Sequence, residues 1–167
     1  MKYLYLVRHA KSSWTDPRLS DFDRPLNKRG KRDVVFMGKR LATLPYRPEM
    51  IVSSPAKRAR KTARAIFAEW NFKKKDITLL DKLYTFSAGP IVEVIRGTPD
   101  SIKVLAVIGH NYGLTECAEM LGGKAIENVP TCGIVLISFA LPTWGQVAPN
   151  SGAVLTLDYP KLHQLDI

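Results

Sequence analysis

The run from Val104 to Ile108 constrains the fold more than any other segment, because every residue in it is apolar. A half-exposed strand alternates apolar and polar residues, whereas a strand inside a parallel sheet is covered on both faces and is apolar throughout. The run therefore predicts a central strand lying between two layers of helices. Such a strand is typical of α/β proteins, in which strands and helices alternate along the chain.

Strand and helix patterns do alternate over the rest of the sequence. Tyr3–Val7 is apolar and predicts a buried first strand that delivers polar residues at its carboxyl end. Further strands are predicted over 50–52, 77–80, 133–139 and 153–158, and helices over 28–44 (capped by Asn27), 54–70, 90–96 and 114–121. We therefore expect a three-layer α/β/α sandwich with a mostly parallel sheet, and a possible antiparallel edge strand where a hairpin-type loop joins the last two strands.

The length of 167 residues suits a single domain spanning residues 1–167. The longest apolar stretch, Gly133–Leu141, is far shorter than the roughly 20 residues of a membrane span, and the first residues do not resemble a signal peptide. We therefore expect a cytoplasmic protein with no membrane partner. In that compartment Cys117 and Cys132 are expected to be buried thiols rather than a disulfide.

The formal net charge of +10 arises mainly from the runs Lys28–Arg32, Lys57–Lys61 and Lys73–Lys75. Each run on its own is compatible with a solvated helix face or turn, and a basic excess can also attract nucleic acid, anionic membranes or anionic substrates. No aromatic residues interleave the runs, and no nucleic-acid-binding motif is present, so no nucleic-acid partner is expected. A protein that handles phosphate groups explains the charge more simply.

Three predicted strands end in residues that suit phosphoryl chemistry. The first strand runs into Arg8 and His9, the central strand runs into Gly109 and His110, and the second strand precedes an arginine-rich helix. The carboxyl ends of parallel strands meet at one edge of a sheet, where α/β proteins bind ligands. A neutral histidine can attack phosphorus, a second histidine can hydrogen-bond the phosphoryl oxygens, and arginines can hold those oxygens.

Three motifs in this order resemble the histidine phosphatase superfamily, the phosphoglycerate mutase-like proteins. Arg8-His9-Ala10 is similar to the family's R-H-G motif, and Ser54–Ala63 is similar to its S-x-x-x-R-A-x-x-T-A motif. Gly109-His110-Asn111 is similar to its G-H-N or G-H-G motif. The three motifs are spread over most of the chain, which makes a chance match improbable.

The resemblance implies a role for each of the matching residues. His9 would be the nucleophile, Arg8 and Arg58 would bind the phosphoryl group, and His110 would complete the pocket. The resemblance also implies that neither a metal nor another cofactor takes part. In agreement, the sequence contains no run of histidines, cysteines or carboxylates at metal-ligand spacing.

The segment Ser20–Gly30 resembles the D-x-x-R-P-L-x-x-x-G segment of the SixA-type branch, whose members act on phosphohistidine in proteins. By this resemblance Arg24 adds a third cation to the pocket. The alternative is that Arg24 pairs with Asp21 or Asp23 and only orders the loop. Trp14 could line the pocket or belong to the core.

One feature of the superfamily is missing. Many members place a glutamate after the arginine-bearing helix as a general acid, and the nearest carboxylates here are Asp81 and Glu93. A leaving imidazole departs without a strong acid, whereas an alkoxide needs one. The leading hypothesis is therefore a phosphohistidine phosphatase whose partner is a phosphorylated protein. The alternatives are a phosphatase that cleaves P–O bonds in small phosphorylated substrates or phosphoproteins, and a phosphate-binding module without turnover.

Overall fold

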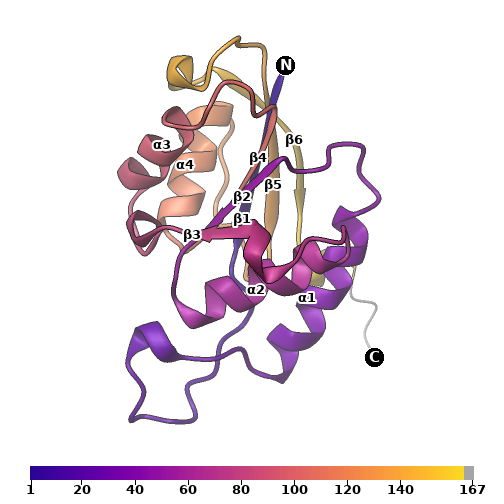
Figure 1. Cartoon of the computed structure of the whole chain (residues 1–167). Helices are drawn as coiled ribbons and strands as arrows, with labels where there is room; N and C mark the ends of the chain where they lie inside the picture. The colour runs from indigo at the N-terminus through magenta and orange to yellow at the C-terminus, as the bar shows by residue number, and fades with distance from the viewer. Residues whose placement is uncertain (164–167) are drawn as a thin grey trace.

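The computed structural model of the chain describes residues 1–163 and contains one six-stranded sheet (Figure 1). Its strands are β1 (Lys2–Arg8), β2 (Met50–Ser53), β3 (Ile77–Leu79), β4 (Val104–Gly109), β5 (Ile134–Phe139) and β6 (Gly152–Asp158). They lie in the order β3-β2-β4-β1-β5-β6. The first four strands along the chain are mutually parallel, and β5 is antiparallel to both of its neighbours, β1 and β6.

Two helices cover each face of the sheet. The helices are α1 (Lys28–Leu41), α2 (Lys57–Ala68), α3 (Ala88–Arg96) and α4 (Gly113–Gly122). Figure 1 shows α3 and α4 on one side of the sheet and α1 and α2 on the other. The predicted three-layer α/β/α sandwich is confirmed. The hairpin-type connection between the last two strands is also confirmed. The strand that runs antiparallel to the others is β5, which lies between β1 and the edge strand β6 rather than at the edge.

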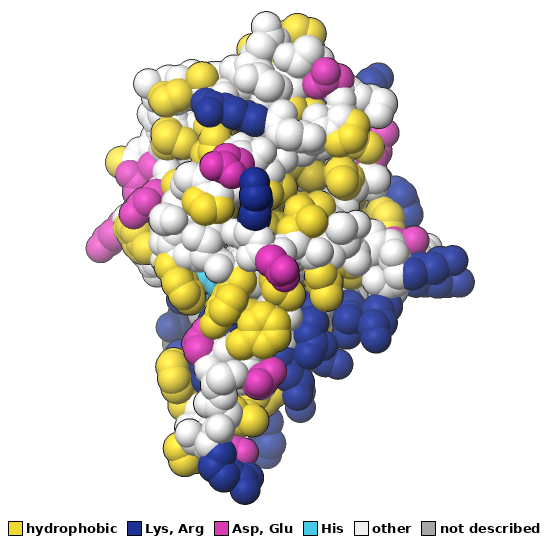
Figure 2. Space-filling model, turned by 60° about the vertical axis from the view of Figure 1, so that its left-hand side comes forward, with side chains coloured by type: hydrophobic (Ala, Val, Ile, Leu, Met, Phe, Trp, Pro, Cys, Tyr) yellow, Lys and Arg dark blue, Asp and Glu magenta, His cyan; other side chains and the backbone are white. Residues whose placement is uncertain are grey.

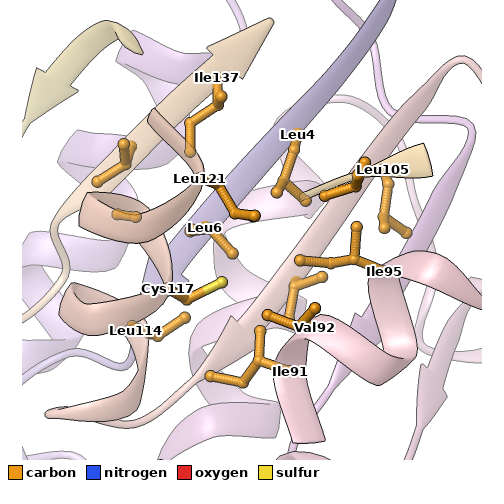
Figure 3. Packing of buried hydrophobic residues seen from close by; sticks show 14 of the residues in the cluster. Leu4, Leu6, Ile91, Val92, Ile95, Leu105, Leu114, Cys117, Leu121 and Ile137 are labelled. Carbon is orange, nitrogen blue, oxygen red and sulfur yellow. The ribbon is translucent and has the colours of Figure 1, made fainter. Parts of the chain in front are cut away.

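Alternate residues of each central strand supply the two halves of the core. Leu4 and Leu6 of β1 point to the α3/α4 side, where they pack with Ile91, Ile95 and Leu121 (Figure 3). Their neighbours in β1 pack against α1 and α2 on the other side. Complete burial of one such aliphatic side chain contributes about 1.5–3 kcal/mol. The apolar runs read from the sequence therefore hold the strand ends in fixed positions.

Two local features place α1 and α2. The side chain of Asn27 accepts a hydrogen bond from the backbone N–H of Gly30 at 2.8 Å, which confirms the predicted helix cap. A Cβ atom on Gly38 would lie 2.9 Å from the carbonyl oxygen of Ile66, so only glycine allows α1 and α2 to approach this closely. Helix α2 also packs against β2, β3 and β4.

Some boundaries differ from those predicted. Helix α1 ends at Leu41 rather than residue 44, and α2 begins at Lys57 rather than at Ser54. Both cysteines are free and buried, as predicted. Within residues 1–163, no helix has the length and apolar character needed to cross a membrane. The single domain over residues 1–167 stays a prediction, because residues 164–167 lie outside the described part.

Candidate active site

The ends of three neighbouring strands converge, because β1, β4 and β2 pair in parallel. Arg8 lies opposite Gly109, and Ser53 lies opposite Ile108. The next residues along each strand are His9, His110 and Ser54, so the register itself brings these three side chains together. The ring centroids of His9 and His110 are 5.2 Å apart.

The hydrogen bonds of His9 assign its tautomer. Its Nδ1 atom lies 2.7 Å from the carbonyl oxygen of Ala10, which can only accept, so Nδ1 carries the proton. The other ring nitrogen, Nε2, therefore keeps its lone pair, and the Nε–H of Arg58 lies 3.4 Å from it. Burial of the ring lowers the pKa of His9 to about 3, so the imidazole is neutral at neutral pH. A neutral imidazole with an unprotonated Nε2 is a nucleophile, and here Nε2 accepts only a long hydrogen bond from Arg58 Nε.

The Ser54 hydroxyl is the hydrogen-bond partner of His110 Nε2. The Ser54 hydroxyl oxygen accepts a hydrogen bond from the backbone N–H of Ala56 at 3.2 Å and lies 2.7 Å from His110 Nε2. When the hydroxyl donates its own proton to Nε2, the proton of His110 lies on Nδ1. Among the residues described, Nδ1 of His110 has no hydrogen-bond partner although it is buried. In this tautomer it is a donor available to a bound anion, and burial again lowers the pKa of this ring, to about 3.

Two arginines lie beside the histidines. Arg58 is only 2% exposed, and its side chain begins in the first turn of α2, directly after the Ser54 turn. Arg8 donates from Nη1 to the carbonyl oxygen of Val129 at 2.9 Å. Its Nε atom is buried and has no partner within residues 1–163. Two buried ring or guanidinium nitrogens, Nε of Arg8 and Nδ1 of His110, thus have no hydrogen-bond partner within residues 1–163. Nitrogens without a partner beside a cation are typical of a site that binds an oxyanion.

A carboxylate connects the arginines to the preceding loop. Asp21 accepts hydrogen bonds from Arg58 Nη2 at 2.9 Å and from the Tyr84 hydroxyl at 2.7 Å, and its backbone oxygen accepts from Arg58 Nη1 at 2.6 Å. Arg24 contacts the same carboxylate through Nε at 3.3 Å and Nη2 at 3.1 Å, and donates to the Ser12 hydroxyl at 2.6 Å. Burial alone would raise the pKa of Asp21, but hydrogen bonds from Tyr84 and Arg58 outweigh it and lower the pKa to about 2.

Arg24 therefore forms an ion pair with Asp21, which is one of the two roles that the sequence left open for it. The same contact also joins Arg24 to Arg58 through one shared carboxylate, so it belongs to the cluster beside the histidines. The indole ring of Trp14 stacks on the Arg24 guanidinium at 3.5 Å and is 73% exposed, which shows that Trp14 is not a core residue.

Exposed aromatic rings border the histidine pair. The ring of Phe86 is exposed and its centroid lies 5.5 Å from that of His110, and Tyr84 lies at the same distance. Figure 2 shows histidine atoms at the surface between hydrophobic side chains. The histidine pair therefore reaches the surface beside the exposed ring of Phe86, although His9 is only 8% exposed and Arg58 lies buried behind it.

Neither carboxylate proposed from the sequence as a general acid reaches the histidines. Glu93 is exposed and pairs with Lys82 at 2.9 Å, and Asp81 is exposed at the start of a short 3-10 helix. The carboxylate that does touch the cluster is Asp21. The position of Asp21 in the D-x-x-R-P-L segment could have indicated this carboxylate, whereas no signal in the sequence marks Tyr84. Among residues 1–163, no three histidine, cysteine or acidic side chains are grouped as metal ligands would be.

Comparisons with known proteins agree with the fold and the motifs. A family model described as histidine phosphatase superfamily (branch 1) matches residues 4–94, more than half of the chain. An uncharacterised chloroplastic protein of Arabidopsis thaliana is 34% identical over 158 residues, which cover 89% of this chain and 72% of that protein.

Two solved structures show how far the likeness extends. The Agrobacterium tumefaciens structure named as phosphohistidine phosphatase SixA has a TM-score of 0.81 at 25% identity, over 95% of this chain and 98% of that one. A mycobacterial glucosyl-3-phosphoglycerate phosphatase has a TM-score of 0.66 at 12% identity, over 95% and 98%, and shares the fold alone. The resemblance predicted from the motifs is confirmed.

Proposed function

Because this chain belongs to the histidine phosphatase superfamily, we propose that it is a metal-independent phosphatase that transfers a phosphoryl group through His9 and acts on phosphohistidine in proteins. The observation that carries the proposal is the state of His9. Its ring is buried and neutral, its Nδ1 proton is held by the Ala10 carbonyl, and its Nε2 lone pair faces the Arg58 guanidinium. A nucleophilic nitrogen beside a buried cation suits attack on a phosphoryl group.

In the first step Nε2 of His9 attacks phosphorus, a P–Nε2 bond forms, and the bond from phosphorus to the leaving atom breaks. Negative charge on the phosphoryl oxygens is met by Arg8 and Arg58 and by the Nδ1–H of His110. These donors are fixed before the reaction, since Ser54 orients His110 and the Val129 carbonyl orients Arg8. Donors that need no reorganisation lower the barrier most effectively.

In the second step a water molecule attacks the phosphorus bound to His9. The P–Nε2 bond breaks, inorganic phosphate leaves, and the neutral His9 is restored. The exposed side of the site, bordered by Phe86, gives water access to the phosphorylated ring. A phosphoglycerate mutase must instead keep water away from its phosphorylated histidine, so the open site favours hydrolysis over transfer to a second substrate.

The choice of substrate rests on the leaving group. Asp21 is the carboxylate next to the cluster, and its pKa of about 2 keeps it ionised, so it cannot donate a proton at neutral pH. Within residues 1–163, neither Asp81 nor Glu93 makes a hydrogen bond or ion pair with the histidines; Glu93 pairs with Lys82 instead. Without a general acid, an alkoxide leaves slowly, whereas a phosphohistidine imidazole can arrive already protonated. This supports phosphohistidine over alkyl phosphates as the substrate.

The test compares three substrates with purified protein: a phosphohistidine peptide, an aryl phosphate and an alkyl phosphate. We expect kcat/KM to be highest for phosphohistidine and lowest for the alkyl ester, with a labelled intermediate that survives alkali, is lost in acid and is absent from His9→Ala. Asp81→Asn and Glu93→Gln should change phosphohistidine turnover by less than about tenfold. Efficient alkyl phosphate turnover that either substitution removes would make a P–O phosphatase the better assignment. A protein that binds phosphate without any turnover would overturn the catalytic proposal.

A further inference from the structure

Helix α2 carries a stripe of cations along one face. Lys57, Arg60, Lys61 and Arg64 are separated by three, four and seven residues, which is the spacing of neighbours on one side of an α-helix. All four are exposed or partly exposed, and residues 57–68 include no acidic residue. We call these four residues the α2 stripe.

The arrangement of the α2 stripe works against the stability of the helix. Like charges three and four residues apart repel one another, and cations in a first helical turn oppose the positive end of the helix dipole. Limited desolvation and the charges of Arg64, Arg60 and Lys57 lower the pKa of Lys61. Within residues 1–163, no side chain of the stripe has an acidic partner. An exposed helix face with no function would be expected to mix both signs of charge.

The neighbouring helix shows the ordinary arrangement. On α1, Arg29 lies 3.5 Å from the Asp33 carboxylate, and Arg40 lies 2.8 Å from the Asp158 carboxylate. On α2, Arg58 pairs with Asp21 inside the site, whereas the four exposed cations of the stripe have no acidic partner within residues 1–163. The charges of the α2 stripe are therefore available to pair with an external anion.

The cationic surface continues beyond the helix. Arg64 lines a shallow hollow together with Lys74, Lys75, Ile77 and Leu79, so the short segment before β3 adds two more cations beside the stripe. Figure 2 shows Lys and Arg side chains gathered on one side of the molecule, in the same view as the surface histidine atoms.

The stripe begins next to the catalytic pocket. Lys57 precedes Arg58, whose guanidinium contacts His9, and the seven residues from Lys57 to Arg64 span about 10 Å of helix axis. We propose that the α2 stripe docks an acidic surface of the phosphorylated protein whose phosphohistidine enters the pocket. The proposal rests on the proposed function and adds to it a recognition surface for the protein around the phosphorylated residue.

A folded protein or peptide suits this surface better than the other anionic partners. A small phosphorylated metabolite bound at His9 cannot also reach charges spread along two turns of helix. A single-stranded nucleic acid needs exposed aromatic rings on which bases stack, and the aromatic residues after the stripe, Trp70 and Phe72, pack partly buried against the core. An acidic protein surface needs only the exposed charges that are present.

The test uses two charge-reversal variants with the same change in net charge. Lys61→Glu/Arg64→Glu alters the stripe, and Lys31→Glu/Lys39→Glu alters exposed cations of α1 as the matched control. Each protein is assayed on a glutamate-rich phosphohistidine peptide, a lysine-rich phosphohistidine peptide and p-nitrophenyl phosphate. Binding of the unphosphorylated glutamate-rich peptide and of a single-stranded oligonucleotide is measured separately by fluorescence anisotropy, over a range of salt concentrations.

We expect the stripe variant to lose about tenfold in kcat/KM on the glutamate-rich peptide and about tenfold in affinity for its unphosphorylated form. Turnover of p-nitrophenyl phosphate should change by less than about twofold, which also shows that the variant is folded. The wild-type preference for the acidic peptide should weaken as salt increases.

Three results would overturn the docking proposal: equal losses in the α1 control, unchanged binding by the stripe variant, or an oligonucleotide bound more tightly than the peptide through the same residues. Failure of the proposed function gives a different pattern. In that case neither phosphohistidine peptide is hydrolysed efficiently, while binding of the unphosphorylated acidic peptide still reports on the stripe.

Discussion

Acidification from about pH 7 to about pH 5 should destabilise the protein through His9 and His110. Both rings are buried, and burial lowers the pKa of each from 6.5 to about 3. In the unfolded chain the rings are hydrated and titrate near their ordinary value. The unfolded state therefore binds more protons than the folded state between these two pKa values, and the free energy of unfolding rises with pH in that window.

The magnitude follows from the two pKa values. Stability from each neutral histidine is fully present above pH 6.5 and is lost as the pH falls toward about 3. At about pH 5 the unfolded ring is almost fully protonated and the folded ring is not, which costs about 2 kcal/mol per histidine relative to neutral pH. The pair together should lower the free energy of unfolding by about 4 kcal/mol, a large part of the total for a small domain. Asp21, with its pKa of about 2, contributes almost nothing in this window.

Urea unfolding at the two pH values measures this loss directly. The buffer must be free of phosphate, because an anion that binds only the folded site would stabilise it. His9→Gln and His110→Gln should each reduce the pH-dependent loss by about 2 kcal/mol, whatever their effect on stability at neutral pH. If the wild type and the double variant lost the same free energy between the two pH values, the rings would not be held neutral, and the assignment of His9 as a neutral nucleophile would fall with them.

Two further substitutions test the contacts around the histidines. Ser54→Ala removes the hydroxyl that we expect to hold the proton of His110 on Nδ1. The value of kcat should then fall by about 10–10², with little change in the free energy of unfolding. An unchanged kcat would show that Ser54 does not set the tautomer of His110. Arg58→Lys keeps the charge but loses the planar fork that reaches both His9 and Asp21, and it should lose about 10²–10³ in kcat/KM, as should Arg58→Ala. A lysine variant with near-normal steady-state kinetics would mean that charge alone is required at this position.

Much of the fold could be predicted because it depends on local patterns. The apolar run of β4 identified a central strand, and the cap residue Asn27 placed the start of α1 correctly. The start of α2 was predicted too early because Pro55 is favoured in a first helical turn. In the folded chain Ser54 stays outside the helix, where its hydroxyl bonds both the Ala56 backbone and His110. A tertiary contact outweighed the local preference there.

The grouping of His9, His110, Arg8 and Arg58 could also be predicted, since each follows or begins an element whose end lies at the same edge of a parallel sheet. The sequence showed no convincing general acid and named Asp81 and Glu93 only as the nearest carboxylates. Both are exposed, and Glu93 pairs with Lys82. Asp21 contacts Arg58 across 37 residues of sequence; its place in the D-x-x-R-P-L segment marks the residue, but not the partner that it meets.

The sequence alone determined the layers of the sandwich, the family motifs and the strand ends that carry the histidines, because periodicity and strand register are properties of short segments. Only the tertiary structure decided that His9 keeps its proton on Nδ1, that Asp21 is the carboxylate that meets Arg58, and that the exposed cations of α2 have no acidic partner within residues 1–163. The last two features depend on hydrogen-bonding groups and charges that are distant in the sequence. Burial then fixes their protonation, because removing water from an ionisable group penalises its charged form unless a partner is at hand.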